Sequence, residues 1–177
     1  DAEGYPASWH QTLVGQSIMQ HTKHDPTYMV RGIDIYSVDG CLQEPFGVFP
    51  YGTAYQIPSH RVESHNPPKI GVRPHEWRAV GHTHTGVAYE CFLDELAHLG
   101  DKDPLALRLH LTRDNDRMHQ LLLRLKEAAD WDQPLAAGRG RGMAARVYSV
   151  SPIAQAVEVT VALDGTFTVD RVVCVVD

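Results

Sequence analysis

The sequence predicts an α+β fold in which a helical insert packs on a largely antiparallel sheet. Hydrophobic residues recur with helical spacing through the middle third of the chain and alternate in its last quarter. The dipeptide Asp164-Gly165, which favours a two-residue hairpin, divides the alternating stretch. The 177 residues, 43% of them hydrophobic, suffice for one core. We therefore expect one unit over residues 1–177, with strands within 1–67, a helical insert over 85–130 and antiparallel C-terminal strands over 141–177.

In the first third, two extended segments frame an irregular one. Residues 9–19 mix apolar and polar side chains in a pattern typical of a strand. A second strand is expected over 55–65, because Pro67-Pro68 then ends it. Residues 21–55 are rich in Gly, Pro and Asp, so we expect irregular structure there, with one short helical turn near 35–42.

The middle third predicts three helices joined by short turns. The first runs over about 85–99, and the second over 103–111, because Asp103-Pro104 is a typical N-cap followed by a first-turn proline. The third is capped by Asp114 or Asn115 and runs to about 129. The expected inner faces are Ala88, Phe92, Leu96 and Leu99 in the first helix, with Val87 and Cys91 beside them, and Met118, Leu121, Leu122, Leu125 and Ala129 in the third. We expect Phe92, Leu96, Leu122 and Leu125 to contact the sheet.

The last quarter predicts a β-hairpin that follows a glycine-rich loop over 138–142. The alternation over 153–163 predicts that Val157, Val159 and Val161 lie on the buried face of the first strand. The return strand ends in residues 172–176, which are apolar at every position except the thiol of Cys174, so we expect both of its faces to be covered.

Composition excludes several classes of function. The formal net charge of -6 disfavours binding to a phosphate backbone, and no apolar stretch approaches the roughly 18 residues that a membrane span needs. The three cysteines, Cys41, Cys91 and Cys174, form no metal or redox motif. The chain starts without Met and stops within an expected strand, so we expect a piece of a longer protein.

No metal-binding, nucleotide-binding or catalytic motif is complete in the sequence. His82 and His84, with His75, supply at most part of a zinc site, so a histidine-dependent metal hydrolase is only a third-ranked hypothesis. Gly138-x-Gly140-x-Gly142 lacks the spacing of a nucleotide loop, and no serine-nucleophile motif occurs. Glu90 and Asp94 share a helix face, but we expect no acid–base catalysis from them.

The segment Trp77–His84 is the most informative, because it leads into the first predicted helix. A helix start offers free N–H groups and a positive dipole end, which together bind anions. Arg78 adds a planar donor fork, and Gly81 allows a ligand to approach the backbone. The alternative, equally supported by these residues, is a capped helix with Arg78 in a structural ion pair.

Longer motifs around this segment resemble a known family. Residues 77–84 read Trp-Arg-Ala-Val-Gly-His-Thr-His, and a helix with Glu90 and Asp94-Glu95-x-Ala97, then Asp103-Pro104 and Arg108, follows. Gly-Arg-Gly-Arg-Gly over 138–142 and Arg-Val-Val-Cys-Val-Val-Asp over 171–177 come later. Together they resemble the molybdopterin-binding large subunits of the xanthine dehydrogenase and aldehyde oxidase family, above all the isoquinoline 1-oxidoreductase beta subunits and their membrane-associated aldehyde dehydrogenase relatives.

The resemblance implies a molybdenum hydroxylase that oxidises N-heteroaromatic or aldehyde substrates with oxygen from water. Molybdopterin cytosine dinucleotide would be the cofactor, a small (alpha) subunit with [2Fe–2S] clusters and a cytochrome the electron acceptors, and the periplasm or the cytoplasmic membrane the location. It places the base glutamate outside this segment, so no catalytic residue is expected here and the segment alone should be inactive. The implied cofactor-binding residues are Trp77, Arg78, Gly81, His82 and His84.

This sequence departs from the family pattern at Ala79, Thr83 and His84, where the family often has a second glycine and Pro-Gln. A side-chain contact from the Gln position is therefore not carried over. The alternative is a non-catalytic anion-binding or interaction domain that shares only the fold.

Overall fold

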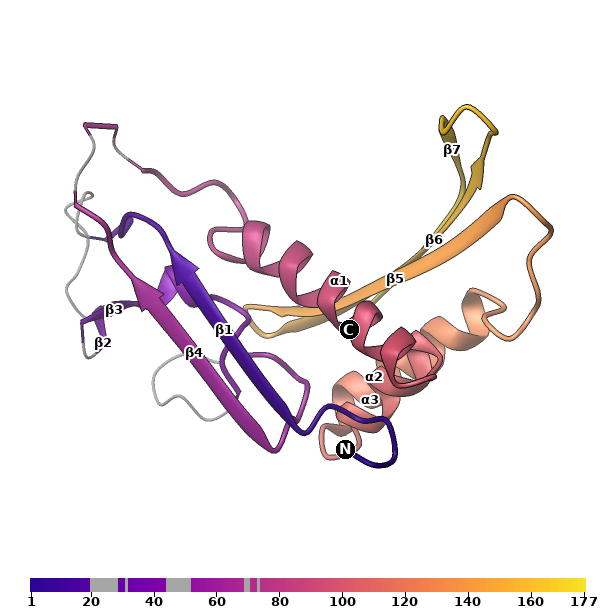
Figure 1. Cartoon of the computed structure of the whole chain (residues 1–177), viewed down its shortest axis with the longest axis horizontal. Helices are drawn as coiled ribbons and strands as arrows, with labels where there is room; N and C mark the ends of the chain where they lie inside the picture. The colour runs from indigo at the N-terminus through magenta and orange to yellow at the C-terminus, as the bar shows by residue number, and fades with distance from the viewer. Residues whose placement is uncertain (20–28, 31, 44–51, 69–70, 73) are drawn as a thin grey trace.

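The computed structural model describes residues 1–19, 29–30, 32–43, 52–68, 71–72 and 74–177. These residues form an α+β structure, as predicted, in which α1 runs between two sheets (Figure 1). The strands are β1 (Ser8–Val14), β2 (Met29–Val30), β3 (Ile33–Asp34), β4 (Ser59–His65), β5 (Arg139–Tyr148), β6 (Ser151–Val161) and β7 (Phe167–Val176). The helices are α1 (His82–Leu99), α2 (Pro104–Leu111) and α3 (Asp116–Ala128), with one 3-10 turn, η2 (Ile35–Val38).

The first sheet pairs β1 with β4, and the two strands are parallel, with Ser8 opposite Ser59 and Val14 opposite His65. Among the described strands this pair is the parallel exception, and the other two sheets are antiparallel, so the prediction of a largely antiparallel arrangement is confirmed. Both strands are shorter than predicted, since β1 ends at Val14 and β4 begins only at Ser59. The turn predicted near 35–42 is η2, and part of the irregular segment over 21–55 lies outside the described residues.

Helices α2 and α3 begin where their capping residues predict. The Asp103 carboxylate accepts a hydrogen bond from the Ala106 N–H at 2.8 Å, and the Asn115 side chain accepts one from the Met118 N–H at 3.1 Å. The inner face predicted for α3 is confirmed. It forms a core with the sheet residues Met143, Ala145, Ala154 and Ala156.

Helix α1 differs from the prediction in its start and in its buried face. It begins at His82 rather than Thr85, and Ala88 and Leu99 of the predicted stripe are exposed. Phe92 still contacts the first sheet, as predicted, because its ring lies edge-on to Trp9 of β1 at 5.2 Å between the centroids, and Leu96 packs against the same core. The buried positions are Thr85, Tyr89, Glu90, Leu93 and Ala97. Aromatic packing explains the difference, because the Tyr89 ring stacks on Trp9 of β1 with 4.0 Å between the ring centroids.

The second sheet has the order β5-β6-β7 and is antiparallel throughout. The chain reverses at Asp164-Gly165 as predicted, but the connection from Val161 to Phe167 is longer than the two-residue turn that this dipeptide favours. Strand β5 already begins at Arg139, so the glycine-rich segment 138–142 is mostly strand and the prediction of a loop there is wrong. Gly140 and Gly142 pair with Val159 and Val157 of β6.

The buried face of β6 is opposite to the predicted one. Ala154 and Ala156 are 1% and 3% exposed, whereas Val157 and Val159 are only partly buried and Val161 is 47% exposed. Small alanine side chains let α3 approach the sheet closely, so packing selects the alanine face over the valine face. At the end of β7, Val173 and Val175 pack against this core while Val172 and Val176 point away and are exposed. Only one face of this strand is covered, contrary to prediction.

Helix α2 joins the two cores of the chain. Leu105 belongs to the core under α3, while Leu107 and Leu111 belong to a second core with Trp9, Tyr55 and Tyr89. None of the helices in the described part of the chain is long and apolar enough to cross a membrane.

We predict that Leu122→Ala lowers the free energy of unfolding by about 2–5 kcal/mol, because the cavity left by a fully buried leucine does not collapse. Urea unfolding followed by far-ultraviolet circular dichroism measures this value. The neighbouring Leu123 is 39% exposed, so Leu123→Ala should cost less than about 1 kcal/mol. Equal losses in the two variants would contradict the observed orientation of α3.

Candidate functional site

A tight turn over Trp77–Gly81 leads into α1. The Val80 N–H donates to the Trp77 carbonyl and the His82 N–H to the Ala79 carbonyl, both at 3.0 Å. Val80 has a φ of 45°, a left-handed conformation that is strained for a β-branched residue. Such strain persists only where the surrounding structure imposes it. Contacts with other parts of the chain must therefore hold this turn in its conformation.

The holding contacts come from the segment that follows η2. The Gly81 N–H donates to a carboxylate oxygen of Asp39 at 3.3 Å, and the Thr85 hydroxyl donates to the Asp39 carbonyl at 2.6 Å. Gly81 also lies so close to the Tyr36 carbonyl that a Cβ would stand 1.8 Å from its oxygen. A side chain at position 81 is therefore excluded, and the start of α1 is fixed against residues 36–39.

Asp39 also changes the chemistry expected of the helix start. The N–H groups of Gly81, His82 and Thr83 are used by Asp39, Ala79 and Val80, respectively. The chain thus places its own carboxylate at the N-terminus of α1, where sequence reasoning expects an external anion. The sequence offered little signal for this role, since Asp39-Gly40 looks like an ordinary turn dipeptide.

Beneath the helix start, Arg146 of β5 fills a slot between glycines. Its Nη2 donates to the Thr85 hydroxyl at 3.1 Å, and its guanidinium lies 5.6 Å from the centroid of the Tyr89 ring. A Cβ on Gly40 would stand 1.9 Å from Nη2, and Gly40 has a φ of +71°. Gly40 is therefore required both by its backbone conformation and by the arginine beside it.

His82 lies next to this slot, half-buried, with its ring edge-on to Tyr148 at 5.4 Å between the centroids. Both of its ring nitrogens are buried and have no hydrogen-bond partner among the residues that the structure describes. Burial, reinforced by the Arg146 charge, lowers the pKa of His82 to about 4, so the ring is neutral at pH 7. Burial raises the pKa of Asp39 to about 7, against the opposing effect of the Gly81 hydrogen bond.

The other residues predicted to bind the cofactor are exposed. Trp77 is 84% exposed, and the side chain of Arg78 also faces solvent. The His84 ring is exposed as well, but its Nε2 lies 3.3 Å from the Ser37 carbonyl oxygen. The Arg78 carbonyl accepts a hydrogen bond from the Tyr148 hydroxyl at 2.8 Å, while its guanidinium makes no ion pair with a described residue. The structure therefore brings the five predicted residues onto one turn and the first helical turn, with Trp77, Arg78 and His84 outward and Gly81 and His82 inward.

A buried ion pair joins α1 to α2 below this turn. The Arg108 side chain is fully buried, and its Nε donates to the Glu90 carboxylate at 3.1 Å while Nη2 donates to the Glu90 carbonyl at 3.0 Å. Its Nη1 donates to Asp94 at 2.5 Å. Burial raises the pKa of Glu90, and the guanidinium groups of Arg108 and Arg146 oppose that shift. The sequence indicated Arg108 only through the family resemblance, and Glu90 through that resemblance and through its place beside Asp94 on one helix face.

The same carboxylate reaches the edge of the second sheet. The Ala145 N–H of β5 donates to Glu90 at 3.0 Å, and the Tyr55 hydroxyl lies 3.2 Å from both Glu90 and the Ala145 carbonyl. Glu90 and Tyr55 thus satisfy the outward backbone groups of an edge strand. Burial raises the pKa of Tyr55 well above its ordinary value, so the hydroxyl keeps its proton.

The histidines do not gather into a metal centre. His75 Nδ1 lies 3.1 Å from Oε2 of the neighbouring Glu76. In the described part of the chain, no group of three or more His, Cys, Asp or Glu residues could hold a metal ion. The metal-hydrolase hypothesis thus finds no ligand set among these residues.

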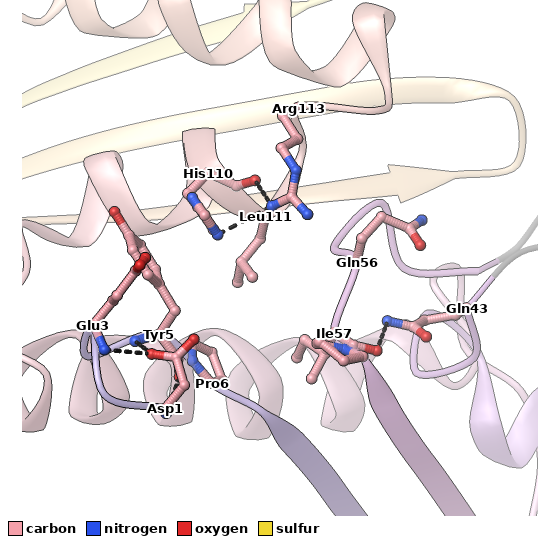
Figure 2. Close-up of a pocket in the computed structure, with 11 residues that line it drawn as sticks. Asp1, Glu3, Tyr5, Pro6, Gln43, Gln56, Ile57, His110, Leu111 and Arg113 are labelled. Carbon is pink, nitrogen blue, oxygen red and sulfur yellow. Dashed lines mark hydrogen bonds between the residues drawn. The ribbon is translucent and has the colours of Figure 1, made fainter.

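A separate cavity of about 390 Å³ lies between the N-terminal segment and the end of α2 (Figure 2). Tyr5 stacks on His110 at its rim, with 3.7 Å between the ring centroids, and Arg113 donates to His110. Gln43 and Gln56 contribute amides from the other side. None of its lining residues belongs to the turn over 77–84, so the two sites are distinct.

Known proteins show only a weak similarity to this chain. No protein-family model and no curated protein matches the chain. A solved structure, "Aldehyde Oxidoreductase from Desulfovibrio gigas (MOP), activated with sodium dithionite and sodium sulfide", is similar to it with 17% sequence identity and a TM-score of 0.35. The alignment covers 92% of this chain and 19% of that chain, so this chain spans about a fifth of that protein's length. At this similarity no residue role passes from that structure to this chain.

We predict that Glu90→Gln lowers the free energy of unfolding by about 3–5 kcal/mol, because it leaves the buried Arg108 charge without its partner. Chemical denaturation at pH 7 measures the loss. Asp94 contacts the same guanidinium but is 38% exposed, so Asp94→Asn should cost about 1 kcal/mol or less. Similar losses in both variants would show that Glu90 is not the principal partner.

The raised pKa of Asp39 predicts a pH dependence of stability. Between about pH 4 and 7 the folded chain keeps a proton on Asp39 that the unfolded chain releases, so the stability that Asp39 contributes falls as the pH rises. His82 acts in the opposite direction over about pH 4 to 6.5, because its pKa is lowered. Asp39→Asn, whose amide oxygen still accepts from Gly81, removes the first effect and leaves the second.

The free energy of unfolding of the wild type, minus that of Asp39→Asn, should therefore decrease from pH 4 to 7. Denaturation at several pH values measures this difference. A difference that does not vary with pH would contradict a raised pKa of Asp39 in the folded chain.

Proposed function

We propose that the chain is part of the large subunit of a molybdenum hydroxylase and that the turn over 77–84 forms part of the surface that contacts the pterin cofactor. The observation that carries this proposal is one connected network. Glu90 and Arg108, which belong to segments that resemble the family pattern, form a buried ion pair. Strand β5 contacts Glu90 through the Ala145 N–H and contacts the turn through the Tyr148 hydroxyl, which donates to the Arg78 carbonyl. Residues that recur together as motifs and also contact one another favour a shared site over a chance likeness.

The residues of the turn fit a pterin bearing phosphates through their side chains. The exposed guanidinium of Arg78 offers two parallel N–H donors to an anionic or carbonyl group. His82 does not add to this surface, because its ring points inward and both ring nitrogens are buried. The N-terminus of α1 does not fit as an anion site, because the Asp39 carboxylate is already there. Binding would therefore depend on Arg78 and not on the helix dipole.

In the proposed enzyme this chain binds and orients. The bound molybdenum cofactor would supply the hydroxylation of an aldehyde or an electron-poor aromatic carbon with oxygen from water. Arg78 would hold an anionic or carbonyl group of the cofactor, and Gly81 would let the backbone approach it. Glu90, Arg108 and Arg146 would keep the turn in place without touching the cofactor. No residue of this chain is assigned a catalytic role.

The finer parts of the proposal follow from the sequence resemblance alone. They are the cytosine dinucleotide form of molybdopterin, a partner subunit with [2Fe–2S] clusters, a cytochrome acceptor, an N-heteroaromatic or aldehyde substrate, and a periplasmic or membrane-associated location. A second candidate function, a non-catalytic interaction domain, is favoured by one observation, the internal carboxylate that occupies the start of α1.

In the complete subunit, we expect Arg78→Ala to lower molybdenum and pterin content per polypeptide about tenfold, as loss of roughly 1.4 kcal/mol of charge-assisted hydrogen bonding would. Elemental analysis and pterin fluorescence measure content, and circular dichroism checks the fold. Arg78→Lys should rescue only in part, because an ammonium group lacks the planar fork. Arg124→Ala on the exposed side of α3 is the matched control and should retain the cofactor.

Two results would contradict the proposal at different levels. Normal cofactor content in Arg78→Ala would exclude the turn over 77–84 as a cofactor-binding surface. A complete wild-type subunit that contains neither molybdenum nor pterin would exclude the enzyme and favour the interaction domain.

A further inference from the structure

Residues 1–6 fold into a small turn beside the end of α2, and we call this segment the hook. The Asp1 carboxylate accepts hydrogen bonds from the Glu3 and Tyr5 N–H groups, both at 2.9 Å, and the Gly4 N–H donates to the Asp1 carbonyl at 3.2 Å. Within the described part of the chain, residues of the hook form hydrogen bonds only with one another. The hook is therefore a unit that can move without breaking hydrogen bonds to other elements.

Packing alone holds the hook against the helices. The backbones of Gly4 and Gly100 lie so close together that neither glycine could carry a Cβ. The Tyr5 ring stacks on the His110 ring, with 3.7 Å between the ring centroids and 12° between the ring planes. Two glycine backbones in contact attract each other weakly, so the stacked rings are the principal contact that keeps the hook in place.

The hook also forms one wall of the cavity at the end of α2 (Figure 2). Asp1, Glu3, Tyr5 and Pro6 line this wall, and the amides of Gln43 and Gln56 belong to the other side. Movement of the hook away from α2 would therefore open the cavity along one side.

The contact next to the stacked rings requires an uncharged His110. Nη1 of Arg113 lies 3.0 Å from Nε2 of His110 and 3.1 Å from its carbonyl oxygen (Figure 2). A guanidinium group can only donate, so Nε2 accepts and carries no proton. A proton on Nε2 would bring two N–H donors and two positive charges together. Burial, and then the Arg113 charge, accordingly lower the pKa of His110.

The other charged groups that face His110 do not reverse this effect. Glu3 of the hook favours the protonated ring, whereas Lys102, between α1 and α2, disfavours it as Arg113 does. Asp114 lies 3.7 Å from Nε of Arg113, but its side chain is 70% exposed, so solvent screens most of its charge. A protonated His110 would thus meet more positive than negative charge.

The aromatic stack does not compensate for this repulsion. A cationic ring gains energy by lying over an aromatic face. Lys102 already lies over the Tyr5 ring, with Nζ 5.0 Å from its centroid, and would be repelled by a second cation. The contact between Arg113 and His110 is shorter, at 3.0 Å, so its repulsion is the stronger interaction.

We propose that the hook is a proton-released lid on the cavity, closed while His110 is neutral and opened when Nε2 takes up a proton from solvent. Opening separates Tyr5 from His110 and lets Arg113 and the charged ring move apart. The closed state holds the pKa of His110 below its ordinary value of 6.5. The closed hook is therefore fully favoured above that pH and becomes less stable as the pH falls below it.

Hydroxyl-radical footprinting of the complete polypeptide tests the proposal, because it reports the exposure of individual side chains. Tyr5 is half-buried in the closed hook, and opening uncovers its ring. From about pH 7.5 to about pH 5, oxidation of Tyr5 relative to Tyr148 should rise about twofold or more. Met118 of α3, which is 1% exposed, should remain unoxidised and so report an intact core.

Substitutions at position 110 separate this titration from others. His110→Phe keeps a ring for Tyr5 to stack on and takes up no proton, so oxidation of Tyr5 should stay at the closed level at both pH values. His110→Gln serves the same purpose with an amide oxygen that can accept from Arg113. The matched control is His98→Phe, at an exposed position in the last turn of α1, which should respond to pH as the wild type does.

Three results would overturn the proposal. Oxidation of Tyr5 that does not rise in acid would show that the hook stays closed. A response that persists in both His110 variants would show that another group controls it. Oxidation of Met118 in parallel with Tyr5 would show general unfolding and no separate lid. Molybdenum content plays no part in these measurements, so the cofactor proposal stands or falls separately.

Discussion

The buried contact between Glu90 and Arg108 determines where the other elements lie. A buried ion pair adds little net stability, since the cost of removing two charges from water offsets most of their attraction. Its effect here is to fix geometry. Glu90 can reach Arg108, Tyr55 and Ala145 at once only if α1 lies at one rotation and one height beside α2 and β5. The two hydrophobic cores on either side of this pair then share a single arrangement.

This arrangement also determines the position of the turn before α1. With the helix fixed, Gly81 at its start lies against Asp39, and Thr85 in its first turn lies against Arg146. Tyr148, at the end of β5, then reaches the Arg78 carbonyl. The strained backbone of Val80 is the local cost of joining these contacts through a short turn. Arg78 is left pointing into solvent from a backbone that cannot shift.

The sequence predicted the helix starts and the hairpin turn, which depend on neighbouring residues. Contacts between distant segments determined which faces of α1 and β6 are buried. The capping residues Asp103 and Asn115 and the turn at Asp164-Gly165 act within a few residues, so the sequence predicts α2, α3 and the hairpin correctly. The buried faces of α1 and β6 were predicted wrongly for a common reason. Both segments are apolar on more than one side, and a polar residue, Glu90 or Glu158, lies on the buried side because a distant arginine receives it. Periodicity cannot reveal such a partner.

The contacts that hold the turn join parts of the chain that are far apart in sequence. Asp39 and Gly81 are separated by 42 positions, Glu90 and Ala145 by 55, and Tyr55 and Ala145 by 90. Closing such long loops is entropically costly and slow compared with forming a helix. During synthesis, α1 can therefore coil early, but its final position must wait until β5 has left the ribosome. The turn over 77–84 is thus among the last parts of the molecule to become ordered.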